Sequence, residues 1–141
     1  MDIEWHGTKA QRDAVRDKFG GRCAYCGCEL EKGWQADHLE PCIRVTRDPH
    51  GRPLAEPYMI KPERNVMSNM MPACPPCNNS KGGYSLEQWR DILQRSAQIA
   101  RRATATFKAG ERFGIISVTE KPVRFYFETQ PNKLFGWEDA A

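Results

Sequence analysis

The sequence lacks any long apolar run. No stretch of its 141 residues approaches the roughly 18 consecutive apolar side chains that a membrane-spanning helix needs. The opening residues 1–6 contain neither a basic head nor an apolar stretch, so no secretory signal peptide is predicted. We therefore expect a protein that has no membrane partner and works in a reducing cytoplasm.

Strong charge bias is also missing. The formal net charge is +3, which is compatible with a polyanionic partner but does not identify one. Internal repeats and low-complexity segments are absent as well. A chain of this length is expected to form one ordinary domain over residues 1–141.

Cysteine, in contrast, is well represented, with six residues of this type. In a reducing compartment, cysteines are more often metal ligands than disulfide partners. Two pairs, Cys23/Cys26 and Cys74/Cys77, have the spacing that lets both sulfurs of a pair face one point about 2.3 Å away, as tetrahedral zinc requires. Together they predict a closed, structural zinc site. The alternatives are two redox thiol pairs or a chance occurrence.

The two pairs are separated by residues 27–73, a longer gap than in short zinc ribbons. A substantial insertion must therefore lie between them, and it contains most of the catalytic candidates. Two cysteines, Cys28 and Cys42, are left over. We expect both to be plain small buried residues.

The first half of the chain predicts a helix, a strand and a long loop. A helix is expected over 8–20, with Thr8 as N-cap and Gly20-Gly21 as its stop. A short strand is expected over 34–38. Half of the ten prolines lie in 39–64, which predicts a long irregular connection.

The second half predicts a long helix and a hairpin. Ser85 and Gln88 form a capping-box pattern, and apolar residues recur at helical spacing over 85–110. The β-branched and aromatic segment 112–128, with Lys121-Pro122 as its turn, predicts a β-hairpin. A polar tail follows over 129–141.

Four polar residues in or beside the insertion carry catalytic chemistry: Asp37, His38, Asn69 and Asn78. An imidazole can take a proton from water near neutral pH, and a divalent cation held by carboxylate and amide oxygens can stabilise charge on a phosphoryl group. Adjacent residues of a strand point to opposite sides. Asp37 and His38 must therefore approach a substrate from different sides, unless the strand ends or twists there.

Over residues 22–83 the chain resembles the HNH endonucleases of the ββα-metal superfamily. The resemblance lies in the two cysteine pairs, the Asp37-His38 step, Asn69, and the run from Cys74 through Asn78 to Lys81. It implies an α+β fold with a small ββα-metal core, a four-cysteine zinc site, flanking helices and a C-terminal β-hairpin.

The resemblance also implies roles for the individual residues. His38 would be the general base, and Asp37 and Asn78 would hold a catalytic Mg²⁺ or Mn²⁺. Asn69 would pin the loop or orient His38, and Lys81 would sit near phosphate. The expected reaction is hydrolysis of DNA with little sequence specificity, leaving 5′-phosphate and 3′-hydroxyl ends.

One position departs from the commonest family pattern, since Asn78 stands where His is frequent. An amide oxygen favours Mg²⁺ or Mn²⁺ over softer ions. Some superfamily branches also have Asn here. Asn65 competes with Asn69 for the middle position but lies four residues too early.

Two other functions stay open. The chain could be a zinc-stabilised DNA-binding module without catalysis. It could also be an accessory subunit of a larger DNA-processing assembly, such as phage DNA-packaging proteins. The zinc cysteines fit the nuclease and the binding module equally, whereas Asp37, His38 and Asn78 favour the nuclease over a pure binder. The expected setting is the cytoplasm of a bacterial or phage-infected cell.

Overall fold

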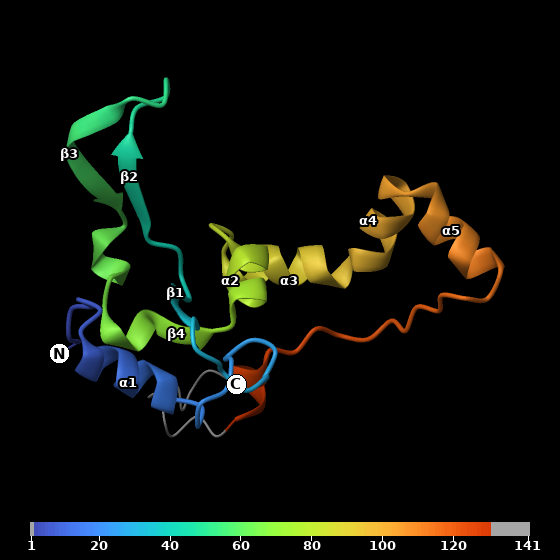
Figure 1. The fold of residues 1–141 in the computed structure, drawn as a ribbon, viewed down its shortest axis with the longest axis horizontal. Coiled ribbons are helices and arrows are strands. Elements are labelled where there is room, and N and C mark those ends of the chain that lie inside the picture. Colours follow the sequence, from blue (N-terminus) through green and yellow to red (C-terminus); the bar gives the residue numbers. More distant parts are fainter. Residues whose placement is uncertain (1, 131–141) are drawn as a thin grey trace.

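The protein is described here by a computed structural model, which covers residues 2–130 (Figure 1). It is a mixed α+β structure, as expected. Its elements are α1 (Lys9–Asp17), β1 (Gln35–His38), β2 (Ile43–Arg47), β3 (Pro53–Ile60), β4 (Met70–Ala73), α2 (Pro75–Lys81), α3 (Leu86–Gln94), α4 (Ser96–Ala103) and α5 (Ala105–Arg112), with single 3-10 turns at Pro62–Arg64, Met67–Asn69 and Tyr126–Thr129. In the part of the chain described, no helix has the length and apolarity to cross a membrane.

The predicted N-terminal helix is confirmed as α1. The side chain of Thr8 accepts a hydrogen bond from the amide of Gln11, so Thr8 is the N-cap. Gly20 and Gly21 follow the helix with φ values of 63° and 81°, which a residue without Cβ adopts at little cost. Val15 is the helix's fully buried residue and anchors it to the body of the protein.

Strands β1 and β4 form a two-stranded antiparallel sheet that places the candidate residues. Its register pairs Asp37 with Met71 and His38 with Met70. Helix α1 packs against β4, and α2 packs against β1. Because side chains alternate along a strand, neighbours on β1 face opposite sides of this small sheet.

An aromatic cluster forms much of the core. The rings of Trp89 and Phe125 stack with centroids 4.9 Å apart, and Tyr25 meets Trp89 edge-on at 5.2 Å. Phe127 stacks on Phe125 at 6.1 Å. Such offset and edge contacts add to the free energy of burying the rings. The cluster connects the first cysteine pair, α3 and the C-terminal part of the described chain.

The connection over 39–64 is not an irregular loop, contrary to expectation. Strands β2 and β3 pair in antiparallel register from Ile43 with Ile60 to Arg47 with Pro53. They form a separate two-stranded ribbon that projects from the body (Figure 1). The prolines are tolerated because Pro53 begins a strand, and because a two-stranded ribbon leaves the outer edge of each strand unpaired.

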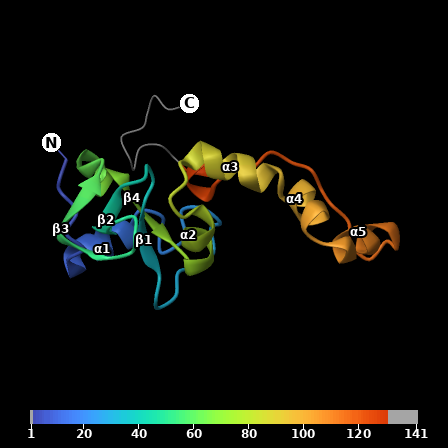
Figure 2. The same ribbon diagram turned by 90° about the horizontal axis from the view of Figure 1, so that it is seen from above.

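The expected single helix over 85–110 is instead three helices. The capping box predicted for its start is confirmed, with Ser85 and Gln88 bonded in both directions. The chain then breaks at Arg95 and again at Thr104, whose φ of −140° is extended and whose side chain caps α5. Helices α3, α4 and α5 lead away from the body as an arm (Figure 2).

The predicted hairpin over 112–128 is wrong. Helix α5 extends to Arg112, residues 116–125 form neither helix nor strand, and a 3-10 turn follows. Side chains of α3 satisfy this segment's backbone, since Gln94 bonds to Lys121 O and Val123 N. Burial of Phe125 beside Trp89 outweighs the strand preference of the sequence. Residues 131–141, most of the polar tail expected at 129–141, lie outside the described residues.

Candidate metal centre and active site

The four predicted cysteines come together. The Sγ atoms of Cys23, Cys26, Cys74 and Cys77 all lie within 4.8 Å of one another. The Cys26 and Cys74 sulfurs are 3.8 Å apart, close to the edge of about 3.8 Å that four sulfurs at about 2.3 Å from a zinc ion would span. The donor set and its spacing therefore suit a structural zinc ion.

Local turns bring the two pairs into this position. The first pair lies on a tight knuckle that closes when Gly27 N bonds to Cys23 O at 3.0 Å, with Gly27 at φ 79°. In the second pair, Cys74 is the N-cap of α2 and Cys77 lies in its first turn. Position 27 has no space for a side chain, because a Cβ on Gly27 would lie 2.8 Å from the Tyr126 ring.

Hydrogen bonds favour the thiolate form of one ligand. The Cys77 thiol and the backbone amides around the cluster lower the pKa of Cys23 to about 4. Among those amides, Tyr25 N and Cys74 N each lie 3.4 Å from Cys23 Sγ. Thiolate is the form that binds zinc.

The two leftover cysteines differ from each other. Cys42 is half-buried, with its sulfur 3.9 Å from the sulfur of Met59, in line with a small packing residue. Cys28 is exposed rather than buried, which corrects the expectation. Its thiol lies against Cys26 and Cys74, at the outer edge of the cluster.

Asp37 lies on the α2 side of β1 and is only 8% exposed. Its Oδ2 accepts a hydrogen bond from the Tyr25 hydroxyl at 2.5 Å and pairs with Lys81 Nζ at 3.1 Å. Burial, and next the Asp37 charge, raise the pKa of Tyr25, so the phenol stays a donor. Both bonds end on Oδ2, so Oδ1 is the atom of Asp37 that could face a cation.

Lys81 does not reach the surface where a phosphate could bind. Its side chain is fully buried, and Nζ donates to His38 O at 2.9 Å in addition to pairing with Asp37. The expectation of a phosphate contact is therefore replaced by a role inside the protein. Lys81 connects the end of α2 to two consecutive residues of β1.

His38 faces the other side of the sheet, as strand alternation requires. Its Nε2 lies 2.9 Å from Asn65 Oδ1, while Asn65 Nδ2 donates to Trp5 O at 3.2 Å. The bond to Trp5 assigns Nδ2 as the donor end of the amide, so the oxygen must accept from His38. The neutral imidazole then carries its proton on Nε2, and Nδ1 is the nitrogen that can act as a base.

Asn69 holds the loop after β1. Its Oδ1 accepts from Glu40 N at 2.9 Å, and its Nδ2 donates to Glu40 O at 3.0 Å and to Arg64 O at 2.8 Å. The side chain therefore joins the segment just after His38 to the segment just before Asn65. Of the two roles expected for Asn69, the contacts support the pinning of the loop.

Asn78 lies inside α2, four residues after the N-cap Cys74. Its amide nitrogen donates to Gln35 Oε1, two residues before Asp37 and on the same side of β1. That bond uses Nδ2, so Oδ1 of Asn78 is the atom available for a cation. Asn78 and Asp37 thus both belong to the interface between α2 and β1.

The chain matches one curated relative. The alignment covers 90 residues at 30% identity with the "SPbeta prophage-derived putative HNH endonuclease YoqL" of Bacillus subtilis (strain 168). The chain is a distant homologue of this HNH protein. The match takes in 62% of the chain but only 32% of the relative, so the chain spans about a third of that relative's length. No family model and no solved structure matches it.

These candidate residues form two groups on either side of β1. Asp37 faces Lys81 and Asn78 of α2, whereas His38 and Asn65 lie toward the N-terminal segment. Sequence reasoning considered Asn65 but ranked it below Asn69, and it missed Tyr25 and Gln35. Spacing could not identify these contacts, because each joins segments far apart in the chain.

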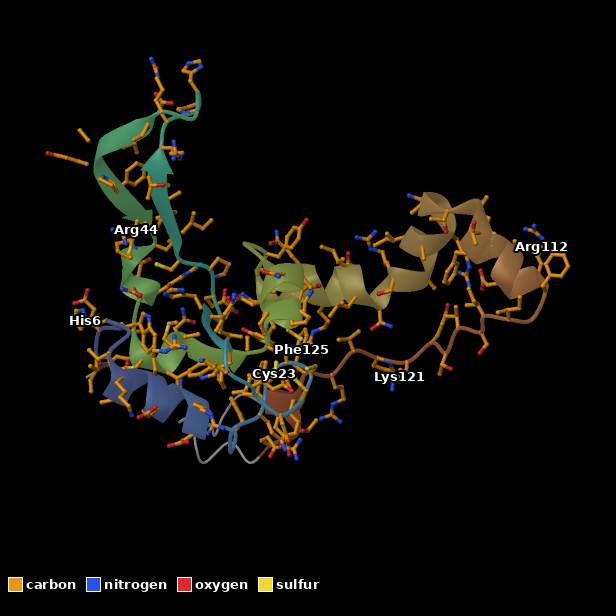
Figure 3. All side chains as sticks on the ribbon, in the orientation of Figure 1. His6, Cys23, Arg44, Arg112, Lys121 and Phe125 are labelled. Atoms are coloured by element: carbon orange, nitrogen blue, oxygen red, sulfur yellow. The ribbon has the colours of Figure 1, made fainter. Side chains whose placement is uncertain are left out.

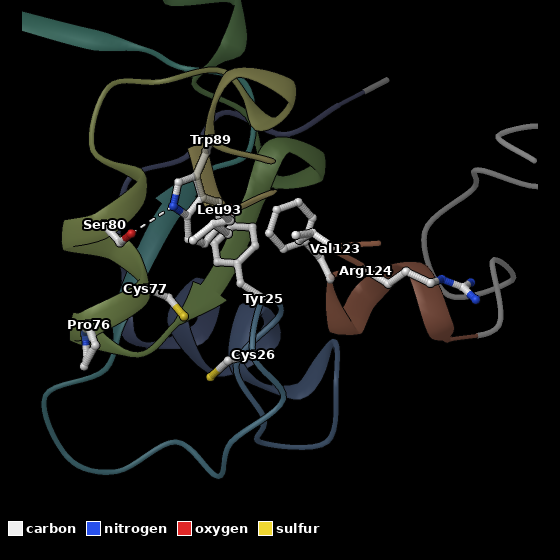
Figure 4. A pocket seen from close by; sticks show the side chains of 10 residues that line it. Tyr25, Cys26, Pro76, Cys77, Ser80, Trp89, Leu93, Val123 and Arg124 are labelled. Atoms are coloured by element: carbon white, nitrogen blue, oxygen red, sulfur yellow. Dashed lines mark hydrogen bonds between the residues drawn. The ribbon is translucent and has the colours of Figure 1, made fainter. Parts of the chain in front are cut away.

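A cavity of about 310 Å³ lies beside the cysteine cluster (Figure 4). Its walls are mainly apolar and include Tyr25, Cys77, Trp89 and Val123, while Trp89 Nε1 donates to Ser80 Oγ at 2.9 Å. None of the catalytic candidates lines it. The cavity therefore lies beside the cysteine cluster and apart from Asp37, His38 and Asn78.

Proposed function

We propose that the chain is an HNH-type, metal-dependent endonuclease that hydrolyses DNA phosphodiester bonds with little sequence specificity. The observation that carries the proposal is the His38–Asn65 contact of 2.9 Å, which leaves imidazole Nδ1 as the base. His38 directly follows the buried carboxylate of Asp37, and four clustered cysteines lie in the same part of the protein. Distant homology to a protein named as an HNH endonuclease supports the same class.

In this proposal, His38 removes a proton from a water molecule. The water oxygen forms a bond to phosphorus, the proton passes to His38 Nδ1, and the bond from phosphorus to the 3′ oxygen breaks. The products carry a 5′-phosphate and, after protonation, a 3′-hydroxyl. Asn65 keeps Nε2 as the donor and so keeps Nδ1 ready to accept.

The carboxylate of Asp37 and the amide oxygen of Asn78 would hold Mg²⁺ or Mn²⁺. Both offer the hard oxygen donors that these ions prefer, and in each side chain the contacts described leave Oδ1 for the ion. When bound, the cation would stabilise negative charge on the phosphoryl and leaving oxygens. Asn69 would keep the loop after His38 in place, and the cysteines would hold structural zinc.

The first test is nicking of supercoiled plasmid with Mg²⁺ or Mn²⁺. His38→Ala is expected to lower the nicking rate at least about a hundredfold, the usual scale for loss of a general base. His6→Ala is the matched control, because that imidazole is exposed and lies beside Glu4 rather than beside His38 or Asn65. Wild type and both variants must have the same zinc content and the same thermal stability for the rates to be compared. A fully active His38→Ala protein would reject the mechanism.

A second candidate function is a zinc-stabilised DNA-binding module without catalysis. The contacts from Tyr25 and Lys81 to Asp37 favour this function, because they already occupy one of the two carboxylate oxygens, Oδ2, that a cation would otherwise bind. Mn²⁺ titration by calorimetry separates the two functions: a nuclease loses Mn²⁺ affinity in Asp37→Asn and Asn78→Ala, whereas a pure binder has no such site to lose. Activity only in the presence of a partner, such as a phage DNA-packaging protein, would instead identify an accessory subunit.

A further inference from the structure

In the sequence, the β2–β3 ribbon lies between His38, the proposed base, and Asn65, its hydrogen-bond partner. The chain enters it at Ile43, five residues after His38, and leaves it at Ile60, five residues before Asn65. Five extended residues span at most roughly 17 Å, so the foot of the ribbon is close to the imidazole. The ribbon itself projects away from the sheet and helices of the body (Figure 1).

The ribbon is basic toward its tip. Arg47 and Arg52 are exposed there, and Arg44 is exposed nearer the foot (Figure 3). The acid at the tip, Asp48, is turned into the loop, where its carboxylate accepts from His50 N, Arg52 N and Arg52 Nε at 2.8–2.9 Å. Asp48 and Arg52 therefore neutralise each other, and Arg44 and Arg47 remain as exposed arginines of the ribbon, against one further exposed acid, Glu56.

Apolar exposure follows the opposite trend. Ile43 and Ile60 face each other across the foot and are 46% and 45% exposed, and Tyr58 pairs with Val45 two residues further out. A protein-binding surface would be expected to combine apolar area with few charges at its centre. The ribbon instead complements a nucleic-acid strand. Its apolar foot can pack against sugars, and its arginines can contact phosphates.

The dimensions also fit a nucleic acid. A strand of β3's length, Pro53–Ile60, extends roughly 26 Å at about 3.3 Å per residue. Two paired strands fit a major groove about 12 Å wide, and the ribbon's length corresponds to roughly eight base pairs. Both faces of the ribbon are largely exposed, so neither is used to cover the body.

We propose that the ribbon Ile43–Ile60 lies in a groove of duplex DNA beside the phosphate on which His38 acts, with Arg44 and Arg47 contacting the backbone. This inference rests on the proposed function, because it places the substrate of that same site. The ribbon positions the duplex and does not take part in the bond changes. Its contacts are to phosphates, which agrees with low sequence specificity.

The test compares Arg44→Gln/Arg47→Gln with the matched control Arg102→Gln/Lys108→Gln. The control removes the same charge from exposed positions on α4 and α5, in the arm that leads away from the body. Binding to a duplex of arbitrary sequence is measured by fluorescence anisotropy over a range of salt, with Ca²⁺ replacing Mg²⁺. Hydrolysis of bis(p-nitrophenyl) phosphate, which is too small to reach the ribbon, is measured with Mn²⁺.

The ribbon variant is expected to bind duplex about tenfold more weakly and to reduce the salt slope by about two, one for each lost phosphate contact. Its hydrolysis of the small ester should stay within about twofold of wild type, since the site itself is intact. The control variant should match wild type in both assays.

Three results would overturn the inference: unchanged duplex binding by the ribbon variant, equal weakening in the control, or a parallel loss of small-ester hydrolysis. Failure of the proposed function is a separate outcome. It would show as full nicking by His38→Ala or as no hydrolysis of either substrate by wild type. Binding with Ca²⁺ does not depend on hydrolysis, so it still decides whether the ribbon contacts DNA.

Discussion

The Asn65 amide oxygen lies 2.9 Å from His38 Nε2, and the amide nitrogen of the same side chain donates to Trp5 O at 3.2 Å. The second bond removes the ambiguity of the amide orientation and so assigns the imidazole tautomer. Asn65 is 9% exposed, so its contacts are not easily replaced by water. These contacts make Asn65 a positioning residue for the base in the proposed reaction.

Asn65→Asp retains an acceptor for His38 but introduces a negative charge beside the ring. The charge stabilises protonated imidazole, so the rising limb of the nicking rate against pH is expected to move to higher pH. Asn65→Leu removes the acceptor and should lower kcat about 10- to 100-fold with little change in KM. A structural role alone would lower the amount of folded enzyme and leave the pH profile where it is.

Lys81 and Asp37 form an ion pair in which the side chains are 1% and 10% exposed. Lys81→Met leaves the carboxylate buried without its cation, so the free energy of unfolding should fall by about 3–5 kcal/mol. Urea denaturation measures the change. Lys108→Met, at an exposed position, is the control and should stay within about 0.5 kcal/mol of wild type.

The double variant Asp37→Asn/Lys81→Met tests the physical cause. Removing both charges should recover part of the lost stability, because no uncompensated charge then remains buried. Equal stability of Lys81→Met and Lys108→Met would contradict the buried ion pair. Additive losses in the double variant would show that the two side chains do not interact.

Cys23→Ser should lose both the zinc ion and the fold, because structural zinc contributes its binding free energy to folding. Metal analysis and circular dichroism of the purified protein measure the two losses together. Cys28→Ser is the matched control, since the Cys28 thiol contacts the cluster but is not one of its four cysteines. It should keep one zinc ion per chain. A folded Cys23→Ser protein without zinc would argue against the metal-stabilised core.

Lys18 predicts a pH dependence of stability. Burial lowers its pKa from 10.5 to about 8, and Nζ donates to Met67 O and Met70 O. Between about pH 8 and pH 10.5 the unfolded chain binds a proton that the folded chain does not, so the free energy of unfolding should rise with pH in this window.

The measurement for Lys18 is the difference in unfolding free energy between wild type and Lys18→Gln at a series of alkaline pH values. Taking the difference cancels the titration of groups common to both proteins. It should grow in favour of wild type by at most about 3 kcal/mol. A difference that is flat or that falls with pH would show that the ammonium is not desolvated in the folded protein.

Short-range patterns predicted much of the local structure correctly. Thr8 and Ser85 cap their helices as expected, because a capping bond joins residues three apart and depends on little else. The cysteine spacing predicted the cluster for a similar reason, since two intervening residues make a knuckle in many surroundings. Alternation along β1 correctly separated Asp37 from His38.

Medium-range predictions failed where packing competes with propensity. Within residues 2–130 the strand-like sequence around Phe125 pairs with no partner strand, because its ring gains more by stacking on Trp89. The helical pattern over 85–110 breaks at Thr104, whose side chain caps a new helix instead of continuing the old one. The prolines of 39–64 suggested a loop, but an isolated ribbon has free edges that accept them.

The sequence by itself determined the chemical inventory: four thiols at zinc spacing, and an acid beside an imidazole on a strand. Only the tertiary structure decided which groups meet. It turned Lys81 inward to Asp37, chose Asn65 over Asn69 as the partner of His38, and placed an arginine-bearing ribbon between that pair. The reason is that these contacts join residues 27 to 44 positions apart, and their geometry depends on how the whole chain packs rather than on local spacing.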